Sequence, residues 1–294
     1  MLTYFQAIFI GLLQGVTELF PVSSLGHSVV LPPLVGWNID QNAPYFLVFL
    51  VATHIATSLV LLGFFRKDWV LIVRGIFRSL AERYIAPDDV YARLGWLIVV
   101  ATVPAGMLGI LFEKSFAALF AAPVAVSIFL ALNGVVLYGS EVLRGKNNQS
   151  LDSATPNDLM ASDPDTKASG LTWSRAVKIG FAQALALLPG FSRTGSALAG
   201  GLLVGLDHES SARFAFLLAT PIIFAAGVLK LPELIVPGNA YPVSQILVGA
   251  IAAAIGAYFS VRYLTRYFQT KTLKPFAIYC LVAGVLSFAV FILR

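Results

Sequence analysis

Six runs of apolar residues in this sequence are each long enough to cross a lipid bilayer as a helix. They cover residues 44–65, 94–112, 116–140, 212–231, 243–261 and 275–293. A spanning helix needs about 20 such residues, and the runs lack the strict apolar–polar alternation of a membrane barrel. The composition agrees, because 58% of the 294 residues are hydrophobic and only 12% are charged. These features predict an all-α polytopic membrane protein and exclude an ordinary soluble domain.

Two further apolar regions, 4–37 and 176–206, are interrupted near their middle by Pro, Gly and Ser. The first break reads Pro-Val-Ser-Ser-Leu-Gly-His over 21–27, and the second reads Pro-Gly-Phe-Ser-Arg-Thr-Gly over 189–195. Backbone that is not helical is tolerated at membrane depth only where it is buried in protein or lines a wet cavity. We therefore expect each region to form a hairpin whose break lies inside the protein.

Basic residues indicate which loops share one side of the membrane. Sixteen of the 20 Lys and Arg residues lie in the segments 66–93, 141–178 and 262–274 and in the 207–212 turn with its flanking Arg213. The positive-inside rule places these four segments in the cytoplasm and leaves the turns at 113–115 and 232–242 outside. The net charge of +5 is then a topology signal, and no nucleic acid is needed as a partner.

This orientation determines how the two broken regions must run. The run 44–65 has to pass from outside to inside, so region 4–37 starts and ends outside, with the N-terminus outside. The run 212–231 has to pass outwards, so region 176–206 starts and ends inside. Full-width hairpins satisfy this orientation too, but the breaks near the middle favour re-entrant ones. Each half then reads as a hairpin followed by three spanning helices, in opposite orientations. That is the layout of an inverted-topology repeat.

A short internal similarity supports the repeat. Gly-Leu-Leu-Gln at 11–14, ahead of the first break, matches Gly-Phe-Ala-Gln at 180–183, ahead of the second. We assign 1–145 to the first membrane repeat and 171–294 to the second. Residues 146–170 between them are polar, with many Asn, Ser, Asp and Thr residues, and are predicted to be a flexible cytoplasmic linker.

Two charged residues, Glu18 and Arg193, fall within the apolar hairpins, and each lies beside a break. A charge at the bilayer centre costs at least about 2.5–3.5 kcal/mol on insertion scales, so it is rarely without a role. One interpretation is a buried ion pair that only locks the two halves together. The polar residues around both charges favour a functional cavity instead.

The polar groups at the two breaks have the chemistry of a phosphate site. The residues that we select are Gln14, Glu18, Ser23, Ser24 and His27 at the first break, and Gln183, Gly190, Ser192, Arg193 and Thr194 at the second. A Gly-containing turn that leads into a helix N-terminus binds anions, and the guanidinium fork fits phosphate oxygens. A carboxylate, a hydroxyl, an imidazole and a guanidinium together suit phosphoryl transfer.

Several of these residues also have a purely structural interpretation. Ser23 or Ser24 alone could equally be a helix N-cap, and His27 alone could be a hydrogen-bonded structural residue. His54 lies within an apolar run and is a weaker candidate for the cavity. Asn133, in the third run, is expected to form hydrogen bonds between helices.

The two motifs resemble those of the BacA-type undecaprenyl-diphosphate phosphatases. Members of that family have a Glu or Gln at the position equivalent to Gln14 and a Glu at the position equivalent to Glu18, both ahead of the first break. The stretch 189–195 matches the family's second motif. The stretch 212–221 is similar to the family's segment after that motif, so the resemblance covers nearly the whole chain apart from the linker. It implies hydrolysis of undecaprenyl diphosphate to the monophosphate, which recycles the lipid carrier of bacterial peptidoglycan synthesis. It also implies a link to bacitracin resistance.

The same resemblance implies roles for individual residues. Glu18, Ser24, His27 and Arg193 are the expected catalytic residues, and members of the family depend on a divalent cation, Mg²⁺ or Ca²⁺. Our own hypothesis is that Glu18, with Gln14, either holds this cation or acts as the base. The residues expected to contact the substrate are Gln14, Ser23, Gln183, Gly190, Ser192 and Thr194. Whether Ser, His or water is the nucleophile stays open. The family's fold is an inverted repeat in the bacterial plasma membrane, with re-entrant helices and a site that opens to the outer face.

The sequence departs from the family at two positions, because Leu25 and Ala197 stand where the family often has Thr. Without these two threonines, the expected phosphate site lacks two hydroxyl groups. The expected partners are a polyprenyl diphosphate lipid and the bilayer, and a homodimer is left open. The alternative is a polyprenyl-phosphate transporter or flippase without hydrolysis, since inverted repeats with broken helices are typical of transporters. The Ser-Ser-x-Gly-His cluster near an Arg favours hydrolysis, because transport alone does not need it.

Overall fold

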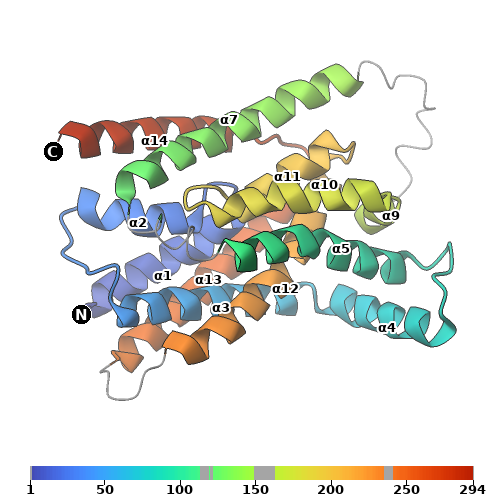
Figure 1. The fold of residues 1–294 in the computed structure, drawn as a ribbon, viewed down its shortest axis with the longest axis horizontal. Helices are drawn as coiled ribbons and strands as arrows, with labels where there is room; N and C mark the ends of the chain where they lie inside the picture. The colour runs from blue at the N-terminus through green and yellow to red at the C-terminus, as the bar shows by residue number, and fades with distance from the viewer. Residues whose placement is uncertain (1, 113–118, 120–121, 149–162, 235–240, 294) are drawn as a thin grey trace.

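The computed structural model describes residues 2–112, 119, 122–148, 163–234 and 241–293, and within them the regular structure is helical, with no β-strand (Figure 1). Six helices among these residues are long and apolar enough to cross a membrane. They are α3 (Pro44–Phe64), α5 (Val90–Leu111), α7 (Pro123–Asn148), α12 (His208–Leu234), α13 (Val243–Tyr267) and α14 (Lys274–Leu293). They correspond to the six predicted runs, which confirms the all-α polytopic class.

Both broken regions form a helix, a break and a second, shorter helix. The first region contains α1 (Tyr4–Leu19) and α2 (Ser24–Leu34), and the second contains α10 (Trp173–Ala184), the 3-10 turn η1 (Leu185–Leu187) and α11 (Arg193–Leu203). Each break follows from a proline, because the residue before a proline is pushed out of the helical region. Leu188, before Pro189, is accordingly extended, with ψ of 122°.

Each second helix begins in the same way, on a serine N-cap. The Ser23 hydroxyl accepts a hydrogen bond from the Gly26 N–H at 3.2 Å, and the Ser192 hydroxyl accepts one from the Gly195 N–H at 3.1 Å. The N-cap interpretation of Ser23 is therefore correct, and Ser24 is the first residue of α2. The two breaks share this capping hydrogen bond, although their backbones differ, with φ of 68° at Ser23 and −87° at Ser192.

Helices of the two halves pack against each other in matching pairs. Helix α1 packs on α13 and α10 packs on α5, while α3 packs on α12 and α7 packs on α14. Two glycines allow the first two contacts. A Cβ atom on Gly11 would lie 2.2 Å from the Gly249 carbonyl oxygen, and one on Gly180 would lie 2.3 Å from that of Ala101. Gly11 and Gly180 are the residues matched in the internal similarity, so both halves use the same close backbone contact.

Helix α11 lies at the centre of the molecule (Figure 1), and residues 194–202 along it are all buried. Its small Ala, Gly and Ser side chains let neighbouring helices come close on all sides. A Cβ atom on Gly201 would lie 2.7 Å from the hydroxyl of Ser211 in α12. This burial holds the N-terminal end of α11, with Arg193, inside the protein.

The four basic segments meet at one end of the molecule, as the charge pattern predicts. Arg213 donates hydrogen bonds to Asp68 at 2.9 Å, in α4 (Arg66–Glu82), and to Asp165 at 2.5 Å, in α9 (Pro164–Ser169). The backbone N–H of Leu273 donates to Glu141 at 2.6 Å, which joins the last segment to the end of α7. Helices α4 and α9 lie towards the right-hand end in Figure 1.

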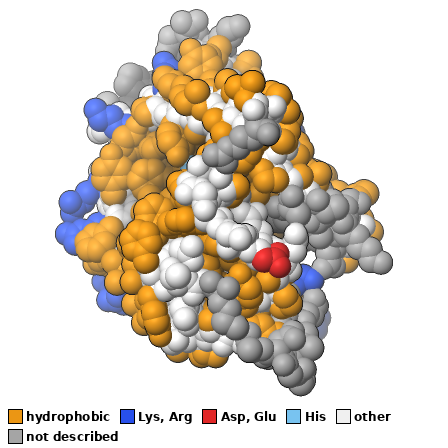
Figure 2. All heavy atoms as spheres, turned by 90° about the vertical axis from the view of Figure 1, so that its left-hand side faces the viewer, with side chains coloured by type: hydrophobic (Ala, Val, Ile, Leu, Met, Phe, Trp, Pro, Cys, Tyr) orange, Lys and Arg blue, Asp and Glu red, His pale blue; other side chains and the backbone are white. Residues whose placement is uncertain are grey.

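Figure 2 shows the opposite end, which is the left-hand side of Figure 1. Hydrophobic side chains dominate this face, and the Lys and Arg groups that are visible lie mainly along its margins. The two ends of the molecule therefore differ in charge, which is the asymmetry that the positive-inside rule requires.

The predicted linker at 146–170 is more ordered at both edges than its composition suggests. Helix α7 continues to Asn148, and α9 is capped by Asp163 and buries Asp165 and Ala168. The reason is pairing with distant residues, because Arg213 holds Asp165 and Asp207 holds Lys167. The structure thus adds a helix and two ion pairs within 163–170 to the predicted linker, whose flexibility stays a prediction, while 149–162 lie outside the described residues.

Candidate active site

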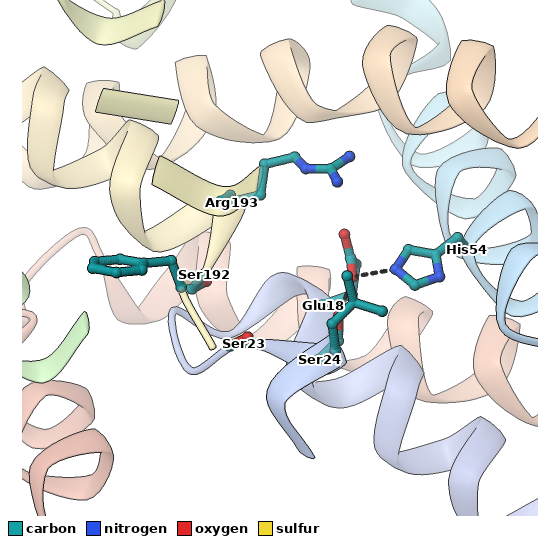
Figure 3. A pocket seen from close by; sticks show the side chains of 9 residues that line it. Glu18, Ser23, Ser24, His54, Ser192 and Arg193 are labelled. Carbon is teal, nitrogen blue, oxygen red and sulfur yellow. Dashed lines mark hydrogen bonds and ion pairs between the residues drawn. The ribbon is translucent and has the colours of Figure 1, made fainter. Parts of the chain in front are cut away.

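The two breaks face a common pocket inside the helix bundle (Figure 3). It is lined by Glu18, Ser23, Ser24, Leu25, His54, Ala186, Phe191, Ser192 and Arg193. Residues from both broken regions therefore meet, although they lie about 170 positions apart in the sequence. The cavity has a volume of about 20 Å³, which is room for about one water molecule. A diphosphate requires the lining to open.

Glu18, near the end of α1, is the only acidic side chain that lines this pocket, and it is buried. Its Oε2 accepts a short hydrogen bond from the Ser24 hydroxyl and another from the Gln14 amide at 3.0 Å. The Nε2 atom of His54 lies 3.2 Å from the same oxygen (Figure 3). These partners offset the cost of burying a carboxylate in the bundle.

Arg193 is the first residue of α11, and its side chain extends towards Glu18 (Figure 3). Among the described residues, its guanidinium group has no hydrogen bond or ion pair, although it is close enough to Glu18 for an electrostatic attraction. Its five N–H donors are therefore available to a ligand in the pocket. The simple interpretation of a Glu18–Arg193 lock is not favoured, because no direct ion pair joins the two.

The first turns of α2 and α11 both border this pocket. Ser24 and Arg193 are the first helical residues after the caps Ser23 and Ser192, and all four line the cavity. A helix N-terminus carries unpaired N–H groups and a partial positive charge, so two of them together form a site for an anion.

His27 is not among the residues that line the pocket. Its ring lies between two other groups, with Nδ1 2.6 Å from the Ser23 carbonyl oxygen and Nε2 2.7 Å from the Tyr279 hydroxyl. The ring of His27 therefore bridges the N-cap of α2 and helix α14. The catalytic role expected for His27 stays a prediction, and the structure adds that both ring nitrogens have partners outside the pocket lining.

Four other selected residues do not line the pocket. The Thr194 hydroxyl donates to the Glu18 carbonyl oxygen at 3.0 Å, which ties α11 to the end of α1. Gly190 has φ of 116°, and an added Cβ atom would lie 2.6 Å from the Val126 carbonyl oxygen. The turn therefore requires a glycine at this position. Gln14 reaches the pocket through Glu18. Gln183 is buried, and neither of its amide atoms has a partner among the described residues.

Asn133 in α7 joins the two breaks directly. Its Nδ2 donates to the Pro21 carbonyl oxygen at 3.1 Å, and its Oδ1 accepts from the Ser192 N–H at 3.1 Å. The predicted hydrogen bonding of Asn133 between helices is confirmed, and it fixes how far apart the two breaks lie.

His54 is the site residue that sequence reasoning underestimated. Its Nδ1 lies 2.8 Å from the Leu50 carbonyl oxygen in the preceding turn, which turns Nε2 towards Glu18. The available signal was a histidine in the middle of an apolar run, where an idle polar side chain is costly.

The pocket offers few groups for a metal ion. Among the described residues, no three His, Cys, Asp or Glu side chains cluster closely enough to form a site. Gln14 Oε1 is buried without a partner beside Glu18, so two oxygen ligands are available. This set fits a hard cation that takes most of its ligands from phosphate and water, as Mg²⁺ commonly does.

The fold and the pocket define a polytopic helical membrane protein with a buried carboxylate–hydroxyl–guanidinium site. A family model described as "Bacitracin resistance protein BacA" matches residues 7–286, and the chain belongs to this family.

Curated relatives match over almost their full length. An "Undecaprenyl-diphosphatase" of Mycolicibacterium paratuberculosis is 50% identical, over 100% of this chain and 99% of the relative. An "Undecaprenyl-diphosphatase 2" of Frankia alni is 44% identical over 97% of each chain. A protein of the same name from Chromobacterium violaceum is 44% identical over 96% of each chain.

Proposed function

We propose that this protein hydrolyses undecaprenyl diphosphate to undecaprenyl phosphate and inorganic phosphate. The BacA family membership and the names of the relatives support this activity. The observation that carries it is the Ser24 hydroxyl hydrogen-bonded to Glu18, with the free guanidinium of Arg193 across the same pocket. A hydrolase uses each of these groups, whereas a flippase needs neither a base nor a nucleophile.

In the proposed reaction, Arg193 and the N–H groups at the starts of α2 and α11 hold the diphosphate. The Ser24 oxygen attacks the terminal phosphorus while its proton passes to Glu18. The bond from phosphorus to the bridging oxygen breaks, and its electron pair leaves with undecaprenyl phosphate. Water then attacks the phosphoserine, giving inorganic phosphate and restoring the Ser24 hydroxyl. Both ring nitrogens of His27 have other partners, which favours Ser24 over His27 as the nucleophile.

We also propose a divalent cation, Mg²⁺ or Ca²⁺, as cofactor. Glu18 and Gln14 are the residues that would hold it, together with oxygens of the diphosphate. When bound, it would neutralise charge that develops on the phosphate oxygens.

The proposed topology is an inverted repeat with two re-entrant hairpins in the bacterial plasma membrane. The matching packing of α1 on α13 and α10 on α5, through Gly11 and Gly180, supports the repeat. The basic end of the molecule then faces the cytoplasm, which leaves the N-terminus outside and the pocket accessible from the outer face.

An apolar groove suits the lipid part of the substrate. It has a volume of about 480 Å³ and lies between α4, α5 and α12, where it is lined by Trp69, Ile72, Ile76, Gly95, Ile98, Val99, Thr102, Val103, Gly106, Met107 and Pro221. On α5 it ends at Met107, two residues before Gly109, where an added Cβ atom would lie 3.5 Å from Leu187, the neighbour of the pocket residue Ala186. We place part of the polyprenyl chain in this groove.

The test is phosphate release from undecaprenyl diphosphate by purified protein in detergent and in proteoliposomes. We expect Ser24→Ala and Glu18→Gln each to lose at least about 100-fold in kcat, and Arg193→Lys to lose bidentate phosphate binding and raise KM. Ser28→Ala, on the next turn of α2, is the matched control and should retain activity. Substrate movement across the vesicle membrane without phosphate release would overturn the proposal in favour of a flippase.

A further inference from the structure

His27 is held at both ring nitrogens by neutral partners. Nδ1 faces the Ser23 carbonyl oxygen at 2.6 Å, and a carbonyl only accepts, so Nδ1 carries the hydrogen. In a neutral imidazole Nε2 is then an acceptor, and it takes the hydrogen of the Tyr279 hydroxyl at 2.7 Å. The two rings also stack, with centroids 5.7 Å apart and planes within 7°. All polar groups in this contact are satisfied by one tautomer.

Ser23, whose carbonyl oxygen accepts the hydrogen bond of the His27 ring, has an unusual backbone conformation. Ser23 has φ of 68°, in the left-handed region that a serine rarely adopts. Such a conformation persists only where surrounding contacts enforce it. Besides the ring of His27, its carbonyl oxygen accepts the His27 N–H at 3.3 Å, and its hydroxyl caps Gly26 at 3.2 Å. The next residue is Ser24, so the conformation of Ser23 decides where the Ser24 hydroxyl points.

Tyr279 supplies this contact from a distant part of the chain. It lies in α14, 252 residues after His27, and its side chain is half exposed on a helix that packs mainly on α7. A phenol on the surface of a membrane-spanning helix needs a partner for its hydroxyl, and His27 is that partner. Helix α14 is thereby connected to the first turn of α2.

We propose that Tyr279 is a positioning residue for the hydrolysis. Its hydroxyl fixes the ring of His27, the ring fixes the strained Ser23, and Ser23 aims the Ser24 hydroxyl at Glu18. Neither Tyr279 nor His27 touches the reacting atoms. The proposal rests on the proposed function, because it assigns the role by its effect on Ser24.

Four variants test it: Tyr279→Phe, His27→Asn, His27→Ala and the double variant Tyr279→Phe/His27→Ala. We expect Tyr279→Phe to lower kcat about tenfold, with KM changed less than twofold, because binding by Arg193 is untouched. The double variant should be no worse than His27→Ala, because the hydroxyl acts through the ring. His27→Asn keeps a donor near the Nδ1 position and should retain several-fold more activity than His27→Ala.

The matched control is Tyr138→Phe, which removes the hydroxyl of another half-exposed tyrosine on a spanning helix. Equal activity of Tyr279→Phe and Tyr138→Phe would overturn the proposal, and so would equally inactive His27→Asn and His27→Ala variants, which would make His27 itself catalytic. Wild-type protein that releases no phosphate would instead overturn the proposed function. Thermal unfolding of each variant is followed by the exposure of the buried Cys280 thiol. A melting temperature close to that of the wild type shows that the variant is folded.

Discussion

The Nε2 atom of His54 lies 3.2 Å from Oε2 of Glu18, the oxygen that also accepts the hydrogen bond of Ser24. His54 therefore belongs to the site, although it comes from a spanning helix outside both motifs. Its ring is oriented by the Leu50 carbonyl, so the contact with Glu18 does not depend on a mobile side chain.

Replacing His54 by Ala is expected to lower kcat about 10- to 100-fold, because a hydrogen bond to a charged group contributes roughly 1.5–3 kcal/mol. His54→Gln can still donate a hydrogen bond to Glu18 and should lose less. The measurement is steady-state phosphate release. His208→Gln changes a histidine at the basic end of the molecule, far from the pocket, and should behave as wild type. If both His54 variants kept full activity, His54 would have no role in the site.

The elements that sequence could predict are those set by local composition. Apolar runs of sufficient length become spanning helices in any fold, and Pro21 and Pro189 interrupt their helices through local backbone geometry. The presence of Glu18 and Arg193 at one pocket could also be predicted, because an apolar protein offers two isolated charged side chains few other polar environments.

The remaining details depend on packing between distant segments. Which side of an apolar helix faces inwards is decided by its neighbours, and α3 turns His54 inwards because it packs on both α12 and α13. The rotation of the short helix α2 similarly brings His27 to Tyr279, a residue 252 positions further along the chain. Helix α9 is ordered by Arg213, which lies 48 residues beyond Asp165 and could not be paired with it from composition.

The groove between α4, α5 and α12 predicts a dependence on the chain length of the substrate. Gly106 lines this groove, and an added Cβ atom there meets no atom within 4 Å, so Gly106→Phe can fill the groove without displacing the backbone. We expect KM for undecaprenyl diphosphate to rise about tenfold, because part of the buried chain is displaced. A short prenyl diphosphate such as farnesyl diphosphate should be hydrolysed as by wild type.

Gly139→Phe is the control for the groove, because Gly139 in α7 also has open space around it and lies outside the groove. It should leave KM unchanged for both substrates. An equal effect of Gly106→Phe on the long and the short substrate would show that the groove does not hold the chain.

The contact between Lys167 and Asp207 predicts a pH dependence of stability. Burial raises the pKa of Asp207, but hydrogen bonds from Lys167 and Ser210 outweigh it and lower the pKa below the ordinary value of 3.8. A carboxylate with a lowered pKa in the folded state stabilises that state above its ordinary pKa, and the stabilisation is lost as the pH falls through the lowered value.

Asp207→Asn should therefore lower the melting temperature by a constant amount between pH 7 and pH 5, and the difference should shrink below about pH 4. The variant keeps the cap on the Ser210 N–H and removes only the charge. Because the pair is partly exposed, we expect a loss of at most about 1 kcal/mol. Lys167→Met should give the same loss, and a difference that grows on acidification would contradict this account.

The charge asymmetry predicts the orientation in the membrane, and cysteine labelling can measure it. The single native cysteine, Cys280, is buried and gives little background. Asn42, in the loop between α2 and α3, and Thr270, between α13 and α14, are both exposed. In intact cells a membrane-impermeant maleimide should label Asn42→Cys, and it should label Thr270→Cys only after permeabilisation, because Thr270 lies in a basic segment. The reverse pattern would place the N-terminus in the cytoplasm and the pocket on the inner side.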